Sequence, residues 1–378
     1  MTLRLGFFYP NNPTAQVLAP EIINTLPSVM DYDLHTKLAT TLERVGFDYA
    51  FLADSWGSFG PHSRAGGYQD PMILPPLLAM HLMGVTKHLR CIATMHTSFL
   101  HPLLIVRMLK ALDAFSKGRC GVNIVAGSGF GDGLDKQVFG SLNPDQRYDR
   151  AIEAIEILLK AWNDTRIAFE GKYFQIDGEM VGPRAPATSR PFIVSAGASD
   201  AGRVLAGRYA DINFMPGRTP QEELKRRMSD IQRIAGEFGR PKGAVRLQIH
   251  ASIVARETEA EAKEYSDWIA SKVDLNLVTE YLNVIRGNIS TYDDVYRMLG
   301  ELQMRQVGTV GGSRKIHGSA EYVADQIEML HREYGCDGLA VTFPVWSVEE
   351  IERFGKLVIP RLKAKGIWVP PAEHDYSW

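Results

Sequence analysis

Eight strand-like runs that alternate with helical segments constrain the fold of this chain more than any other feature. Each run is short and rich in apolar, β-branched or aromatic residues, and segments with helical spacing separate the runs. The runs cover residues 3–9, 47–53, 89–97, 120–126, 191–197, 211–214, 245–255 and 338–343. Such alternation is typical of an α/β fold with a parallel sheet.

The count of eight predicts a (β/α)8 TIM barrel, because a final helix over residues 348–363 can close the ring. The alternation alone also permits an open, doubly wound sheet. The expected helices cover residues 32–45, 71–83, 102–115, 146–162, 199–209, 222–238, 257–272, 320–334 and 348–363.

We expect one domain over residues 1–378, with insertions at 56–70, 165–190 and 275–315 where no strand–helix step fits. The second insertion contains a predicted hairpin around Glu170 and Gly171. In the third, residues 307–310 are expected to be extended.

Composition excludes several classes of protein. The chain has 378 residues, of which 45% are hydrophobic and 23% charged, so it is long and apolar enough for a large core. The net charge of −2 and the lack of a basic run argue against a nucleic-acid partner. Three distant cysteines indicate free thiols in a reducing cytoplasm. We find no metal-ligand spacing, signal peptide or membrane-spanning apolar run.

One polar residue interrupts the most apolar strand. The fourth run carries Asn123 among small and apolar residues, and the glycine-rich segment 127–133 follows it. A buried amide without hydrogen bonds costs roughly 1–3 kcal/mol. Asn123 is therefore either a core amide that neighbouring backbone satisfies, or a polar group directed at a ligand at the carboxyl end of a barrel strand.

The other predicted strand ends carry mostly neutral hydrogen-bonding groups, with no compact acid–base pair and no hydrolase, zinc-protease or P-loop motif. The segment 195–202 (SAGASDAG) opens a helix and is either a phosphate cradle or a tight packing turn. Arg147 and Tyr148 open another helix, where they bind phosphate or only cap and pair. His96 and His250 are candidate general bases or hydrogen-bonded core histidines.

Five segments in order give the chain a resemblance to a known family. They are GFDYAFLADS, IATMHTSFLHPLLIVRMLKALDAFSKGRCGVNIVAGS, DQRYDRAIEAIEILLKAW, FEGKYF with PFIVSAGASDAG, and GRYADINF. The chain resembles the bacterial luciferase-like flavin monooxygenases, and within them the group that contains pyrimidine, alkanesulfonate and dimethylsulfone monooxygenases. The resemblance covers nearly the whole chain.

The resemblance implies a (β/α)8 barrel enzyme that uses reduced FMN (FMNH2) from a separate NAD(P)H:flavin reductase. Molecular oxygen is the co-substrate, activated as a flavin peroxide that oxygenates a small organic molecule. A heterocyclic amide or an organosulfur compound is the expected substrate class. Family members are commonly homodimers or homotetramers. Two alternatives stay open: F420-dependent hydride transfer in a related barrel, and a non-catalytic flavin-binding protein.

The family motifs assign catalytic roles to three residues. Thr94 and Asn123 match a threonine and an asparagine near flavin N5, where oxygen binds. Phe214 matches a phenylalanine that lines the oxygen pocket. Asp54 and Ser55 lie where the second strand of the family meets the isoalloxazine ring.

The same motifs assign the FMN phosphate to Arg147, Tyr148 and Ser199, together with backbone N–H groups near Gly197. An acidic residue of the family falls near Asp135, although the loop is longer in this chain.

Two departures from the pyrimidine monooxygenases alter the substrate side of the pocket. Ser128 stands where they have tryptophan, and Ala53 where they have methionine. Both departures argue against uracil as the substrate. The residues expected to line the substrate side are Trp56, Tyr68, His96, Ser128, Phe130 and Trp346.

Overall fold

Eight parallel strands close into a barrel in the computed structural model, which describes residues 2–14, 16–127, 134, 137, 142–183, 187–197, 199–288 and 300–378. Neighbours around the ring run β1-β2-β3-β4-β7-β8-β9-β11, and β11 pairs with β1 to close it. The TIM-barrel prediction is therefore confirmed, and the open sheet is excluded. The strands are β1 (Arg4–Phe8), β2 (Tyr49–Leu52), β3 (Arg90–His96), β4 (Cys120–Val125), β7 (Phe192–Ser195), β8 (Ile212–Met215), β9 (Arg246–Arg256) and β11 (Gly338–Thr342).

Helices surround the barrel as the sequence predicts, with ends that differ by a few residues. They are α2 (Tyr32–Val45), α4 (Pro75–Val85), α5 (Pro102–Ser116), α7 (Pro144–Trp162), α8 (Asp200–Tyr209), α9 (Gln221–Glu237), α10 (Glu259–Ser271), α14 (Ala320–Arg332), α15 (Val348–Leu357) and α16 (Ile359–Ala364). Local chemistry fixes their ends. Asp31 caps α2 by accepting from two backbone N–H groups, and Gly46 ends it in the left-handed conformation. The predicted helix over 348–363 is divided at Val358.

Strand residues alternate between two apolar layers, so one face of each strand points into the barrel. The inner layer includes Phe51, Ile92 and Val194, whereas the outer layer packs against the helices. Strand pairing places Thr94 opposite Asn123, and both lie on the same face of their strands as this inner layer. The barrel thus directs both predicted catalytic side chains inward.

The region 301–319 differs from its prediction. Residues 307–310 form the end of α13 (Glu301–Val310) rather than an extended piece, so that prediction is wrong. All four residues of this last helical turn, 307–310, are buried. A ninth parallel strand, β10 (Arg314–Ser319), pairs with the carboxyl-terminal half of β9. Its polar sequence gives no apolar strand signal.

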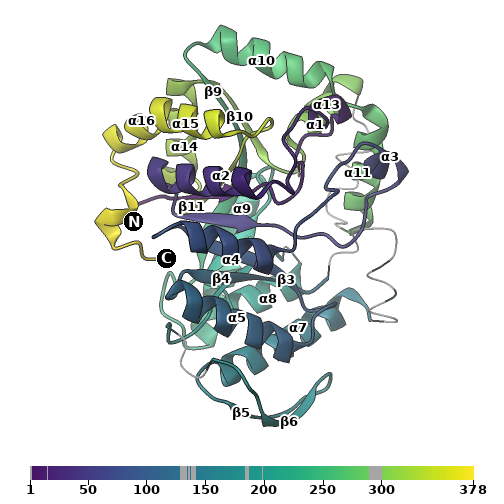
Figure 1. The fold of residues 1–378 in the computed structure, drawn as a ribbon, viewed down its shortest axis with the longest axis vertical. Coiled ribbons are helices and arrows are strands. Elements are labelled where there is room, and N and C mark those ends of the chain that lie inside the picture. Colours follow the sequence, from purple (N-terminus) through teal and green to yellow (C-terminus); the bar gives the residue numbers. More distant parts are fainter. Residues whose placement is uncertain are drawn as a thin grey trace.

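Two further segments flank the barrel. The predicted hairpin exists as β5 (Arg166–Glu170) and β6 (Gln175–Glu179), an antiparallel pair that lies beside α5 and α7 in Figure 1. On another side, the short helix α3 (Pro61–Ala65) packs near α11 (Leu275–Asn288). The remaining short helices are α1 (Pro20–Ile23) and η2 (Pro371–His374).

All three cysteines are buried and free, as the sequence predicts. Over the described ranges, no helix has the length and apolar character needed to cross a membrane. In the same ranges, no group of three His, Cys, Asp or Glu side chains could hold a metal ion.

Candidate active site

Thr94 and Asn123 form a hydrogen-bonded pair on neighbouring strands β3 and β4. The Asn123 amide donates from Nδ2 to Thr94 Oγ1 over 3.1 Å, and both residues are at most 4% exposed. Within the described part of the chain, the buried Asn123 Oδ1 has no hydrogen-bond partner. The donor side of this amide therefore bonds a side chain, and its acceptor side remains available to a ligand.

Four stacked or tilted rings occupy the barrel interior. Phe51 stacks on Phe214 with centroids 4.9 Å apart, and on Phe8 at 5.6 Å. His250 stacks on Phe8 at 4.2 Å, and burial lowers its pKa to about 3. His250 thus serves as a neutral ring of this aromatic layer. Phe214, predicted to line an oxygen pocket, is part of the same layer.

Asp54 and His96 meet at the carboxyl ends of β2 and β3. The Asp54 Oδ2 and His96 Nε2 atoms are 3.7 Å apart, and His96 Nε2 also lies 3.3 Å from the Asp54 carbonyl oxygen. Burial raises the pKa of Asp54 to about 7, and hydrogen bonds from Trp56 and the Ser55 backbone partly oppose this rise. Burial lowers the pKa of His96 to about 4. Asp54 can therefore exchange a proton near neutral pH beside a neutral imidazole.

An aromatic pair lies next to this carboxyl–imidazole contact. Trp56 stacks on Phe99 with centroids 4.3 Å apart, and the Phe99 ring also meets the edge of His96 at 6.2 Å. Ser55 turns its hydroxyl toward its own loop, because Oγ donates to the Gly57 carbonyl. Of these residues, Phe99 was missed by the sequence reasoning, although its place in the long resemblance motif is the signal that could have found it.

The predicted phosphate residues come together where β4, α7 and α8 meet. Ser199 caps α8 by accepting from the Gly202 N–H at 3.1 Å, and it also bonds the Tyr148 hydroxyl. Arg147 reaches back to the Gly127 carbonyl at 3.5 Å. A Cβ atom at Gly197 would lie 2.7 Å from the Tyr148 hydroxyl, so this close approach requires glycine. Hydroxyls, a guanidinium and a helix amino terminus thus converge.

The remaining predicted site residues do not join this constellation. Tyr68 is buried in a separate apolar cluster, with its ring 5.4 Å from Phe59. Trp346 is buried and donates to the Pro13 carbonyl over 2.6 Å. Trp346 and Tyr68 are therefore both packed in the protein core. The predictions for Ser128, Phe130 and Asp135 lie outside the described residues.

Comparisons with known proteins agree with this geometry. The family described as luciferase-like monooxygenase matches residues 3–337. Pyrimidine monooxygenase RutA of Acinetobacter baylyi is 25% identical over 96% of this chain and 95% of its own length. The FMNH2-dependent dimethylsulfone monooxygenase of Pseudomonas putida is 27% identical, with 88% of each chain covered. The crystal structure of long-chain alkane monooxygenase (LadA) superposes with a TM-score of 0.84 and 25% identity, covering 98% of this chain and 93% of that chain.

Proposed function

The chain belongs to the luciferase-like monooxygenase family, and from this premise we propose that it is the oxygenating component of a two-component system that uses FMNH2. A separate NAD(P)H:flavin reductase supplies the reduced flavin, and molecular oxygen is the co-substrate. The FMNH2-dependent relative supports this choice of cofactor. Reduced flavin, when bound, supplies the electrons that activate oxygen for transfer to a substrate.

The residues at the carboxyl end of the barrel fit a flavin mononucleotide. Its phosphate would be held by Arg147, Tyr148 and Ser199 at the amino terminus of α8, where positive partial charge favours an anion. Gly197 keeps the backbone close enough for its N–H groups to contribute. The ring system would lie toward the inward-facing pair of Thr94 and Asn123.

The observation that best supports the proposal is that the Asn123 amide oxygen is available to accept a hydrogen bond from a ligand. Asn123 Oδ1 is a buried acceptor without a partner in the described residues, which suits the N5–H group that a flavin carries when reduced. Thr94 accepts the bond from Asn123 and keeps its own hydroxyl proton to donate. A donor held in a buried site stabilises negative charge that develops on oxygen.

Asp54 and His96 provide the proton-handling side of the proposed site. Their side chains are 6% and 2% exposed and lie next to the stacked rings of Trp56 and Phe99. A carboxyl with a pKa of about 7 is suited to give or take a proton at neutral pH.

For the substrate we propose a small organic molecule, either a heterocyclic amide or an organosulfur compound. The named substrates of the relatives support both classes, because one acts on pyrimidines and another on dimethylsulfone. We further propose that the enzyme works in the cytoplasm, because its buried cysteines are free thiols. We also propose that it is a homodimer or homotetramer, because these assemblies are common in the family.

The test is an anaerobic titration of the protein with FMNH2, followed by mixing with oxygenated buffer while absorbance is recorded. We expect saturable binding and a transient absorbance that free FMNH2 does not give. Failure to bind, together with binding of F420, would instead favour hydride transfer. Tight binding followed by the same reoxidation as free flavin would indicate a flavin carrier.

A further inference from the structure

Three arginines point into the opposite, amino-terminal mouth of the barrel. Strand pairing aligns Arg4 with Gly338, Arg90 with Tyr49, and Arg246 with Ile212, which puts all three guanidinium groups on the inner face of the sheet. Within the described ranges, none of the three forms an ion pair with a carboxylate inside 4.0 Å.

The contacts of these arginines are with neutral groups. Arg4 donates to Ser377 Oγ over 3.3 Å, and the Arg90 guanidinium lies 4.7 Å over the Trp378 ring. Arg246 lies 5.5 Å over Phe192. Burial first, and then repulsion by the neighbouring guanidinium groups, lowers the pKa of Arg90 to about 10, although Asp48 partly compensates.

The one acidic side chain among these residues is already engaged. Asp48 Oδ2 accepts from the Leu5 N–H over 2.7 Å, and Oδ1 lies 2.9 Å from His374 Nε2. One oxygen of this carboxylate is therefore held by a backbone donor, the other makes no hydrogen bond in the described residues, and three cationic groups face the carboxylate.

Buried polar atoms without partners surround the same space. In the described part of the chain, Tyr49 Oη, Arg4 Nη1 and Arg90 Nε are buried and make no hydrogen bond, and neither atom of the Gln248 amide does. Tyr49 is 2% exposed. The three arginines, Tyr49 and Trp378 line a cavity of about 10 Å³, which is room for one water-sized group, and the Asp48 carboxylate is part of the same lining.

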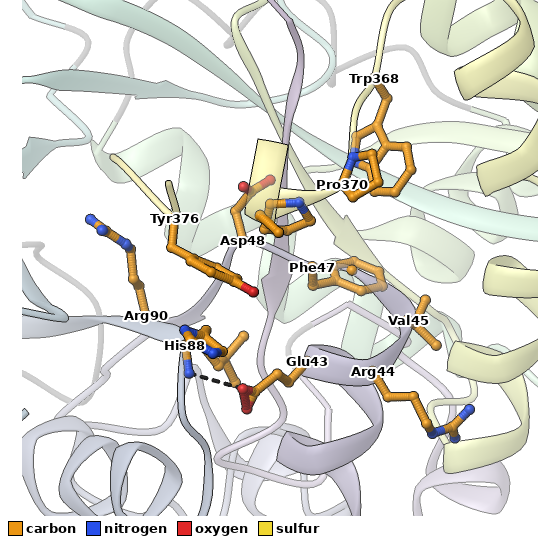
Figure 2. Close-up of a pocket in the computed structure, with 14 residues that line it drawn as sticks. Glu43, Arg44, Val45, Phe47, Asp48, His88, Arg90, Trp368, Pro370 and Tyr376 are labelled. Atoms are coloured by element: carbon orange, nitrogen blue, oxygen red, sulfur yellow. Dashed lines mark hydrogen bonds between the residues drawn. The ribbon is translucent and has the colours of Figure 1, made fainter. Parts of the chain in front are cut away.

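A larger and more open pocket adjoins this cavity, and the two share lining residues. This pocket of about 300 Å³ also has Asp48 and Arg90 in its lining, together with the segment that carries Trp368 and Tyr376. Figure 2 shows Arg90 and Tyr376 on one side of it, with Asp48 between Arg90 and Trp368.

We propose that the amino-terminal mouth of the barrel binds one monatomic inorganic anion of the size of chloride, between Arg4, Arg90 and Arg246. Guanidinium groups and a tyrosine hydroxyl can all donate to such an anion. A water molecule would satisfy the hydrogen bonds but bring no negative charge to three guanidinium groups that share the single Asp48 carboxylate of the cavity lining. The cavity is too small for phosphate while Trp378 stacks on Phe192 at 4.1 Å.

The first test is thermal unfolding in bromide, with gluconate added to keep the ionic strength constant. A ligand that binds only the folded state stabilises it in proportion to the logarithm of its concentration above the dissociation constant. We expect the melting temperature to rise by about 2–5 °C between about 1 mM and about 200 mM bromide. Arg90→Gln and Tyr49→Phe should remove most of this rise.

The matched control is Arg233→Gln, which removes a positive charge from an exposed arginine paired with Glu237 on α9. This variant should keep the full rise. An equal response of wild type and all variants would overturn the proposal, because it would mark a general salt effect.

Crystals grown in bromide provide a second test that does not require any variant to fold. We expect an anomalous peak between the three guanidinium groups. Bromide found only on the surface, with water in the cavity, would refute the site. Neither test depends on flavin binding, so either result is independent of the proposed oxygenase activity.

Discussion

A single side-chain amide, that of Asn123, should distinguish oxygen activation from flavin binding if the proposed function is correct. We predict that Asn123→Ala abolishes substrate oxygenation and changes the affinity for FMNH2 by less than about tenfold, because the phosphate contacts remain. Product formation and anaerobic binding would be measured side by side. Asn213→Ala is the control, since Asn213 is also a buried amide with an unpartnered Oδ1 in the described residues, but it lies on the face of its strand opposite to Ile212 and Phe214. Unchanged product yield in Asn123→Ala would remove this residue from the mechanism.

The phosphate assignment makes a separate prediction for Arg147. Arg147→Ala should weaken FMNH2 binding by about 1–3 kcal/mol, the cost of losing a hydrogen bond to a charged group. Ser199→Ala should have a similar effect, with some loss of stability because Ser199 also caps α8. Titration of flavin fluorescence or absorbance gives both affinities. The control Arg203→Ala removes a cation from the same helix that pairs with Asp200. Equal affinities in all variants would contradict the assignment.

The raised pKa of Asp54 predicts how stability changes with pH. Folding raises this pKa from 3.8 to about 7, so the folded state holds the proton more tightly. That contribution is complete below the unfolded pKa and is lost as pH rises through the folded value. The free energy of unfolding of the wild type should therefore fall by about 2 kcal/mol, relative to that of Asp54→Asn, as the pH rises from about 5 to about 8. Urea unfolding of both proteins at these two pH values measures the difference in their free energies of unfolding. A difference that does not change with pH would show that Asp54 ionises normally.

The sequence predicted the identities at this site better than their contacts. Thr94 and Asn123 could be brought together in advance from the family motif, and the strand register of the structure places them opposite each other. The approach of Asp54 to His96 could not, since it depends on side-chain directions just beyond two strand ends. The packing of Tyr68 in an apolar cluster could not be predicted, because an aromatic residue in a long loop gives the same signal whether it lines a pocket or fills a core.

Among the elements, the loop after β8 shows how closely the barrel packs against β10. A Cβ atom at Gly217 would lie 2.1 Å from both the Arg314 nitrogen and the His250 oxygen, which are backbone atoms that cannot move aside. We predict that Gly217→Ala destabilises the fold by about 3 kcal/mol or more. Chemical denaturation would measure this change.

Gly236→Ala is the matched control for that substitution. Gly236 lies in α9 and has no heavy atom within 4 Å of the added methyl group. Helix propensity should make this variant more stable by about 0.5–1 kcal/mol. Equal stability of the two variants would show that the contact at Gly217 relaxes freely.

Element type followed from apolar spacing wherever a strand is buried on both faces or a helix has one apolar side. That pattern fails for β10, whose six residues are mostly polar and which pairs only with β9. It also fails at residues 307–310, where a short apolar run suits a strand or a helix equally.

In the molecule as a whole, the two ends of the barrel carry different chemistry. The carboxyl end gathers neutral donors, a carboxyl group with a raised pKa and the proposed phosphate cradle, whereas the amino-terminal mouth gathers cationic groups. The eight-strand count predicted closure, because eight inward-facing strands fill a barrel of this size with side chains. The substrate could not be predicted, since the loops that shape its pocket follow no periodic pattern.

The contact between α3 and α11 makes sequence changes in two distant segments depend on each other. The Glu280 carboxylate accepts from the backbone N–H groups of His62 and Ser63, although Glu280 and His62 are 218 residues apart in the chain. A relative that changed either segment alone would lose the cap of a helix or leave a carboxylate without its donors. Recombination between family members should therefore preserve function only when both segments come from the same parent.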